Sequence, residues 1–151
     1  MSARIPYQEV YQLQPTLAQA LISLGEAVEQ SGFSATLTHL VKLRASQLNG
    51  CAFCQHMHAN EARQDGEKQA RLDILPAWRE VTGAFDAKEQ AALAWTEKLT
   101  LLANSDITAA DFDAVATQFT SVEIVNLTAL IVAINGWNRI AVAFHFQPVL
   151  R

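Results

Sequence analysis

The chain has two cysteines, Cys51 and Cys54, which form a Cys-x-x-Cys motif, and His58 follows four residues after the second. An Asn-Gly pair, typical of helix ends and turns, directly precedes the motif, so we expect a new helix to begin at the cysteines. The free N–H groups and the macrodipole at a helix N-terminus favour negative charge and hence the nucleophilic thiolate. At helical spacing, the two cysteines and the histidine share one face.

Residues of these types at this spacing could reduce a peroxide. Two cysteines three apart in a helix can cycle between dithiol and disulfide. Peroxide reduction needs a thiolate that attacks the O–O bond, a donor that protonates the leaving alkoxide, and a second thiol that resolves the sulfenic acid. Cys54, His58 and Cys51 could take these roles in that order. A bridge across so short a loop would stabilise the fold little, so its purpose would be redox.

Two other interpretations of the motif remain open. The cysteines could be small buried hydrophobic residues without a reaction. Alternatively, Cys51, Cys54, His56 and His58 include enough ligand types for zinc. However, histidines two residues apart point to different sides of a helix, so the four ligands do not close locally around one ion. We therefore expect no metal and no bound cofactor, and we expect His56 to face solvent or a neighbouring subunit.

The elements that must position the motif are predicted to be helices, because apolar residues recur at helical spacing and no convincing stretch alternates with period two. Three pairs have the spacing of capping boxes: Asp86/Glu89, Thr108/Asp111 and Thr120/Glu123. Residues 4–14 are expected to be irregular. The predicted helices cover residues 15–30, 35–48, 51–64 with Met57 and Ala62 inward, 67–74, a short piece at Trp78, 86–104 with Leu102 buried, a helix from Thr108 that carries Phe119, and 121–144.

Composition sets the class of the protein. Half of the 151 residues are hydrophobic, and only six are glycine and four proline. We predict an all-α fold, a compact array of about six or seven helices in a single domain over residues 1–151. The net charge of −4, without a basic and aromatic patch, argues against nucleic acid as a partner.

Location and assembly also follow from the apolar segments. The longest apolar run, residues 129–134, is far too short to span a bilayer, and the first residues lack the apolar core of a signal peptide. We therefore expect a soluble, cytoplasmic protein without membrane association. The stretch 127–134 is apolar nearly all round its helix, which is more than one small bundle is expected to cover. This predicts a homo-oligomer.

Several stretches of the chain resemble one known family. They are the run Leu40–Cys54 followed by Met57 and His58, and the segments Ala77–Glu80, Ala91–Glu97 and Ile134–Arg139. Here the chain is similar to the carboxymuconolactone decarboxylase superfamily, in its AhpD-like alkylhydroperoxidase branch. The resemblance implies an all-helical protein that assembles as trimers or hexamers and reduces hydroperoxides through a Cys-x-x-Cys disulfide cycle, without metal or haem. It also implies re-reduction by an external thiol donor or a lipoyl-type partner.

The resemblance assigns peroxide attack to Cys54, resolution to Cys51 and a place in the proton relay to His58. Two positions depart from the family pattern. Twelve residues before the first cysteine the family usually has a glutamate, and here that position is His39; some members have a histidine where this chain has Phe53. An imidazole can accept a proton near neutral pH, so His39 could replace the carboxylate, and a weaker or differently tuned peroxidase is equally open.

These observations lead to one main functional hypothesis and several alternatives. The main hypothesis is a thiol-dependent peroxidase that acts on hydroperoxides in antioxidant defence. A general disulfide oxidoreductase or a redox sensor could use the same two cysteines without peroxide turnover. A lactone decarboxylase without redox chemistry is disfavoured, because a pair of cysteines has no evident use in that reaction.

Overall fold

The computed structural model describes residues 4–151, which fold into eight α-helices and two 3-10 helices without any strand. The bounds are α1 Tyr7–Leu13, α2 Pro15–Gln30, α3 Ala35–Leu48, α4 Ala52–Gln64, α5 Gln69–Ile74, η1 Leu75–Glu80, α6 Ala87–Thr100, η2 Leu102–Asn104, α7 Ala109–Ala116 and α8 Ser121–Ala143. The prediction of an all-α fold is confirmed. The predicted number of helices, six or seven, is too low.

The additional helix is α1, in a segment that was expected to be irregular. It is seven residues long and buries only Val10, so its own sequence carries little helical signal. Its position depends instead on residues at the other end of the chain. The ring centroids of Tyr7 and Tyr11 lie 5.0 and 6.3 Å from that of Phe146. Such long-range contacts are invisible to periodicity.

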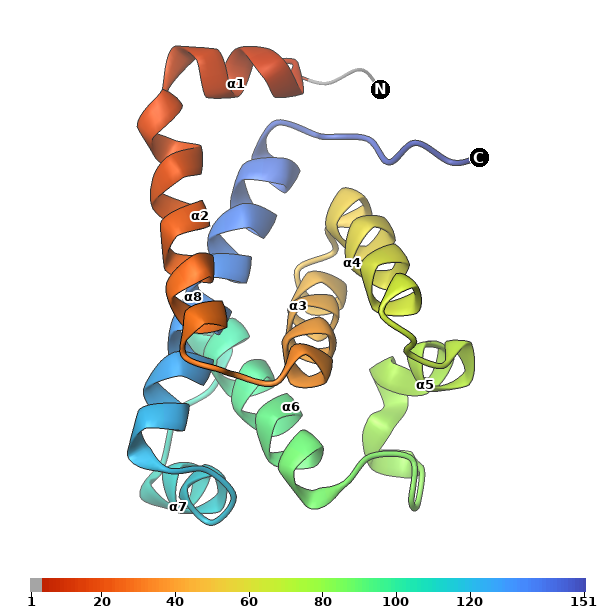
Figure 1. Cartoon of the computed structure of the whole chain (residues 1–151), viewed down its shortest axis with the longest axis vertical. Coiled ribbons are helices and arrows are strands. Elements are labelled where there is room, and N and C mark those ends of the chain that lie inside the picture. The colour runs from red at the N-terminus through yellow and green to blue at the C-terminus, as the bar shows by residue number, and fades with distance from the viewer. Residues whose placement is uncertain (1–3) are drawn as a thin grey trace.

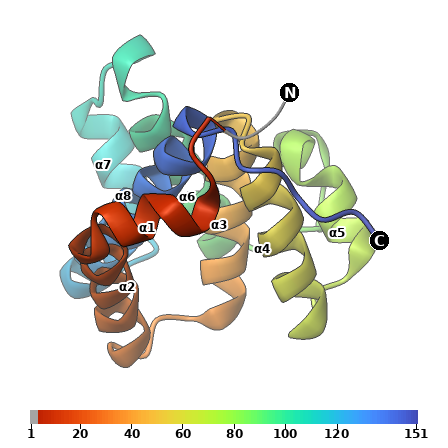
Figure 2. The same cartoon turned by 90° about the horizontal axis from the view of Figure 1, so that it is seen from above.

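The remaining helices form a bundle around α3. Figure 1 and Figure 2 show α3 near the centre, where it packs against α4, α6 and α8, while α2 packs along α8. α4 carries Cys54 and His58. It begins just after the end of α3 and runs back alongside α3. The first described residues and the C-terminal segment lie on the side of the molecule where α4 begins. The two chain ends are therefore placed to cover the cysteine motif.

α8 is the longest helix and the main core element. Leu127, Leu130 and Ile134 are at most 1% exposed. By length and composition alone α8 could also cross a membrane. Within residues 4–151 it packs against α2, α3 and α6, as a core helix does. Val125 and Val132 remain 69% and 56% exposed, so one side of this helix is not covered within a single chain.

Local signals set most helix boundaries. All three predicted capping boxes are present with both of their hydrogen bonds, and the Ser34 side chain accepts from the Leu37 N–H at 3.3 Å. Ala62 is buried as predicted, but Met57 is 37% exposed rather than inward. Leu102, also predicted to be buried, is 57% exposed because α6 ends before it and the chain continues as a separate 3-10 turn.

Candidate active site

The Cys-x-x-Cys motif begins where α3 ends. Gly50 adopts the left-handed conformation, with φ of 63°, and turns the chain from the end of α3 into α4. Cys51 is the N-cap of α4: its N–H donates to the Ser46 carbonyl at 3.0 Å, and its Sγ accepts from the Cys54 N–H at 3.2 Å. The predicted start of a helix at the cysteines is confirmed.

Cys51 and Cys54 are joined by a disulfide, with their Cα atoms 5.3 Å apart. One turn of helix brings two cysteines to this separation, as the spacing predicted. The two residues are 2% and 1% exposed. The molecule therefore holds the oxidised member of a dithiol–disulfide pair, and water has almost no access to it.

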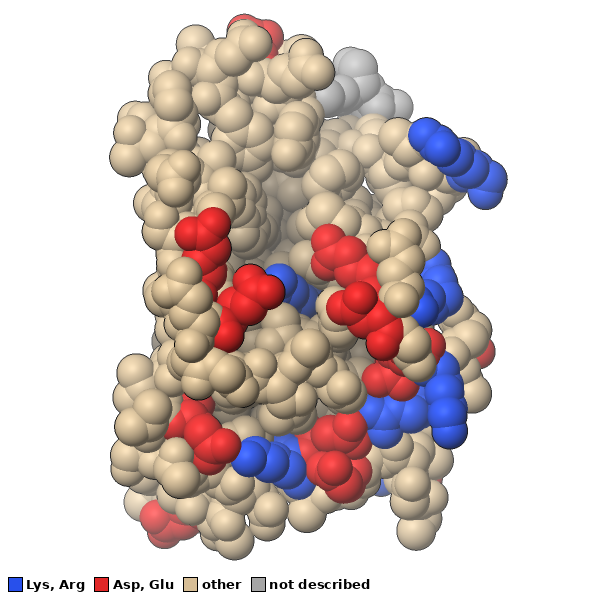
Figure 3. All heavy atoms as spheres, viewed as in Figure 1, with Lys and Arg blue, Asp and Glu red and all other residues tan. Residues whose placement is uncertain are grey.

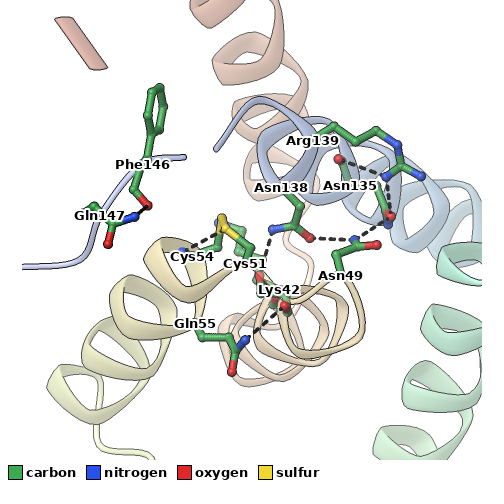
Figure 4. Close-up of a disulfide and its surroundings, with 11 residues drawn as sticks. Lys42, Asn49, Cys51, Cys54, Gln55, Asn135, Asn138, Arg139, Phe146 and Gln147 are labelled. Atoms are coloured by element: carbon green, nitrogen blue, oxygen red, sulfur yellow. Dashed lines mark hydrogen bonds between the residues drawn. A yellow bond between two sulfur atoms is a disulfide. The ribbon is translucent and has the colours of Figure 1, made fainter. Parts of the chain in front are cut away.

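A buried polar network fixes the turn before the motif. Asn138 on α8, which is fully buried, donates to the Ser46 hydroxyl at 3.0 Å and accepts from the Asn49 amide at 2.9 Å. The same Asn49 amide donates to the side-chain oxygen Oδ1 of Asn135 at 3.0 Å. Figure 4 shows Asn49, Asn135 and Asn138 meeting beside the disulfide. Because a buried amide is costly unless its hydrogen bonds are made, this network anchors the Asn-Gly turn to α8.

Four aromatic side chains pack against one another beside the disulfide, and we call them the aromatic cover: Tyr7, Tyr11, Phe53 and Phe146. Phe146 belongs to one apolar cluster with both cysteines, and the other three rings lie within 5.0 to 6.3 Å of its centroid. The cover combines α1, α4 and the C-terminal segment. It explains why the disulfide is buried although it lies at the beginning of a helix.

Arg4 ties the two ends of the chain together at the cover. Its N–H donates to the Phe144 carbonyl at 3.0 Å, and its guanidinium donates to the Ala143 carbonyl at 2.8 Å. Burial, and secondarily the neighbouring Tyr7, raises the pKa of Tyr11 to about 12. The phenol of Tyr11 is therefore neutral at physiological pH, which suits a residue in an apolar cover.

His58 lies one turn beyond Cys54 on α4 and is 5% exposed. Its Nδ1 is 2.9 Å from Oε2 of Glu61, and its Nε2 is buried without a hydrogen-bond partner among residues 4–151. The hydrogen bond from His58 lowers the pKa of Glu61 below its usual value. The ionised carboxylate accepts from Nδ1, which leaves Nε2 as the nitrogen available for proton transfer.

His39 lies at the other end of α4. Its Nε2 is 2.6 Å from Oδ2 of Asp65, the residue that ends α4. Asp65 follows Cys54 by eleven residues, which corresponds to about 16 Å along a helix axis. The structure thus joins Cys51 to Cys54 and has His58 one turn beyond Cys54 on α4. It pairs His39 with Asp65 and not with the cysteines.

A groove opens between α2 and α3 on the side of His39. It has a volume of about 380 Å³, and the ionisable residues in its lining are His39, Lys42, Asp65, Glu26 and Glu29. Figure 3 shows acidic side chains on both sides of this hollow, with a basic side chain within it. The groove gives solvent access to the edge between α3 and α4.

Comparisons with known proteins identify the family. Residues 15–98 match the sequence model of the Carboxymuconolactone decarboxylase family. The chain is also 34% identical to the uncharacterised protein YdfG of Bacillus subtilis over 143 residues, which are 95% of each chain. This protein belongs to the carboxymuconolactone decarboxylase family. The family resemblance predicted from sequence is confirmed.

Solved structures place this carboxymuconolactone decarboxylase family protein in the AhpD-like branch. A protein of unknown function from Agrobacterium tumefaciens, described as a candidate antioxidant defence protein AhpD, is 37% identical with a TM-score of 0.91 over 99% of this chain and 100% of the other. A peroxidase-related protein from Silicibacter sp. TM1040 is 20% identical, with a TM-score of 0.80 over 93% and 74% of the two chains. The debrominase Bmp8, solved with 2,3,4-tribromopyrrole, is 19% identical, with a TM-score of 0.77 over 91% and 73%. The last two show a shared fold only.

Two features of this AhpD-like site were not predicted from the sequence. Glu61 lies three residues after His58, a spacing that puts both side chains on one helix face, so the pair could have been found from sequence. Asn138 interrupts the apolar run of α8, which signals a polar role without revealing its partner. Among residues 4–151, no group of three or more His, Cys, Asp and Glu side chains could hold a metal ion. Nε2 of His56 lies 3.2 Å from the side-chain amide nitrogen of Asn60.

Proposed function

We propose that this AhpD-like protein is a thiol-dependent peroxidase that reduces hydroperoxides in antioxidant defence. The observation that carries the proposal is the Cys51–Cys54 disulfide at the N-terminus of α4, with the buried His58 one turn beyond Cys54 on the same helix. A reversible disulfide, a helix N-terminus that favours the thiolate and an imidazole in reach are the three requirements of the reaction. The high similarity to the Agrobacterium protein described as a candidate AhpD supports it.

The reaction balances with these residues alone and one external reductant. The Cys54 thiolate attacks the terminal oxygen of ROOH, the O–O bond breaks, and the alkoxide leaves as ROH after taking a proton from His58. The resulting sulfenic acid of Cys54 is attacked by the sulfur of Cys51, so that the disulfide forms and water leaves. A dithiol of the external thiol or lipoyl class then supplies two electrons and two protons and restores both thiols.

The aromatic cover supports organic hydroperoxides as substrates. We expect a peroxide to reach Cys54 past Phe53 and Phe146, which belong to the same apolar cluster as the disulfide. An alkyl or aryl group gains apolar contact there, whereas hydrogen peroxide gains none. A substrate of this class is therefore expected to have the lower KM.

The decisive experiment compares cysteine variants. Wild type is expected to oxidise a dithiol in the presence of cumene hydroperoxide, and Cys54→Ser is expected to lose this turnover. Cys51→Ser keeps the attacking thiol, so it is expected to consume about one equivalent of peroxide and to form a sulfenic acid that dimedone traps. Undiminished steady-state turnover of Cys54→Ser would overturn the proposal.

A second candidate function is a disulfide oxidoreductase or redox sensor that uses the same cysteines. The burial of the disulfide beside the aromatic cover favours the sensor, because a sensor needs only rare oxidation events, whereas an enzyme needs repeated access to its cysteines. Rates measured with a small disulfide and with cumene hydroperoxide distinguish the two functions. Faster reaction with the disulfide would favour the oxidoreductase.

Assembly and location belong to the same proposal. The exposed Val125 and Val132 on α8 and the nearby Leu102 support a homo-oligomer, a trimer or hexamer, in which a second copy covers them. A cytoplasmic location fits an enzyme that depends on a supply of reducing thiols. Light scattering that shows only a monomer would contradict the oligomer.

A further inference from the structure

We infer that Glu61 is a positioning residue, which holds His58 with its Nε2 toward the cysteines. It supplies from α4 a carboxylate that the family resemblance implies at position 39, where this chain has His39. The inference rests on the proposed peroxidase function, but the contacts of His58 from which it is argued do not depend on that function. Nδ1 of His58 lies 2.9 Å from the Glu61 carboxylate, and the buried Nε2 has no partner among residues 4–151.

The contact with Glu61 selects one tautomer of His58. A carboxylate only accepts hydrogen bonds, so Nδ1 carries the hydrogen and Nε2 presents its lone pair. Cys54 is four residues before His58, and side chains at this spacing are neighbours on a helix. Nε2 can take the thiol proton of Cys54, and the imidazolium then returns this proton to the alkoxide when the O–O bond breaks. Glu61 stabilises the imidazolium between the two transfers.

The surroundings of Glu61 keep it ionised for this role. The hydrogen bond from His58 and the charges of Lys42 and His39 on α3 lower its pKa and outweigh the effect of burial. Its side chain is 43% exposed, so the carboxylate faces solvent while the imidazole is enclosed. Asp65, four residues after Glu61, pairs with His39. Glu61 is therefore the carboxylate that pairs with His58.

Position 39 lies on the same edge between α3 and α4 as Glu61. The charge of His39 acts on Glu61, and its ring contacts Asp65, four residues further along α4. A carboxylate placed at position 39 is therefore in a position to act on His58 when Glu61 is removed. This arrangement makes a rescue experiment possible.

The test uses Glu61→Leu, with Asp65→Asn as a matched control that removes a carboxylate one turn away. Because Glu61 is on an exposed helix surface, its substitution is not expected to prevent folding. In ¹⁵N imidazole spectra of the disulfide form, wild type and Asp65→Asn are expected to show one His58 tautomer with the hydrogen on Nδ1. Glu61→Leu is expected to show a mixture. An unchanged His58 spectrum in Glu61→Leu would overturn the inference.

Reactivity of Cys54 gives a second readout that does not depend on peroxide turnover. In a Cys51→Ser background, the rate of Cys54 alkylation by iodoacetamide at pH 7 is expected to fall about tenfold in Glu61→Leu. This is less than the roughly 10²–10⁴-fold contribution of a general acid or base itself, because Glu61 acts only through His58. When His39→Glu is added to Glu61→Leu, the logarithm of the alkylation rate is expected to recover at least half of its loss. If the double variant reacts as slowly as Glu61→Leu, the claim that a carboxylate at position 39 can act on His58 is refuted. If these results hold while wild type lacks turnover with cumene hydroperoxide, the proposed function fails and the positioning role stands.

Discussion

Phe146→Ala is expected to expose the disulfide to reductants without unfolding the protein. Phe146 is 6% exposed, and its ring centroid lies 5.0 Å from that of Tyr7 and 5.7 Å from that of Phe53. It comes from the C-terminal segment, which α1 and Arg4 hold in place. Removing this ring takes away the part of the aromatic cover that joins the chain ends to α4. Reduction of the Cys51–Cys54 disulfide should then become faster under native conditions.

The size of the effect follows from the burial of the ring. Truncating a buried phenylalanine to alanine costs about 3–5 kcal/mol, and a terminal segment that can relax should fall at about 3 kcal/mol. If the disulfide is reduced through local opening of the cover, this cost is removed from the opening free energy. Each 1.4 kcal/mol corresponds to a factor of ten, so the reduction rate should rise about 100-fold.

The assay counts free thiols against time in a water-soluble phosphine, below the urea unfolding transition of each variant. Phe119→Ala is the matched control, because Phe119 is 5% exposed but packs against Phe33, in a core cluster that does not contain the cysteines. It should lose a similar unfolding free energy and leave the cover intact. Equal acceleration in both variants would mean that reduction requires global unfolding. No acceleration in Phe146→Ala would mean that the cover does not protect the disulfide.

Two further predictions concern stability, and both are measured by urea unfolding. Gly50→Ala should destabilise the protein by about 1 kcal/mol, because Gly50 has a left-handed backbone conformation. Gly25 lies inside α2, and an added methyl group there meets nothing within 4 Å, so Gly25→Ala should stabilise the protein by about 0.5–1 kcal/mol. Loss of stability in both variants would refute the conformational argument. Glu97→Gln should cost about 3 kcal/mol at pH 7, since it leaves the nearly buried Arg44 with a neutral partner. Burial raises the pKa of Glu97, but hydrogen bonds from Arg79, Trp78 and Arg44 outweigh it and lower the value. The stabilisation is therefore present above the unfolded value of about 4.3 and is lost as pH falls through the lower folded value, so the cost of Glu97→Gln should shrink in acid; a cost independent of pH would contradict this sign.

Local signals in the sequence were sufficient for most of the fold and for the centre of the site. Capping boxes, Pro15 at the first position of α2 and the Asn-Gly turn at the end of α3 act within about four residues, so each could be read without knowing the tertiary structure. Cys51 is the N-cap of α4, and Cys54 and His58 lie in its first half. Their mutual arrangement was predictable because helical spacing alone determines it.

Partners that are far apart in the sequence were not predictable in this way. Asn138 meets Ser46 across 92 residues, and Phe146 reaches the motif from the C-terminal segment. The polar interruption of α8 was visible, but many buried groups could have satisfied it. The short helix α1 was missed for the same reason, since its stability comes from contacts with the cover rather than from its seven residues.

The position of His39 follows from the connection between α3 and α4. Two helices joined by a turn this short run back along each other, so residues equally far from the turn on either side face one another. His39 is twelve residues before Cys51, and Glu61 and Asp65 are ten and fourteen residues after it. Counting from the turn therefore puts position 39 opposite the second half of α4, where the structure has it. A side chain at this position, imidazole or carboxylate, therefore acts on Cys54 through side chains of α4. Glu61, the partner of His58, is then the residue that sets the proton affinity of the relay.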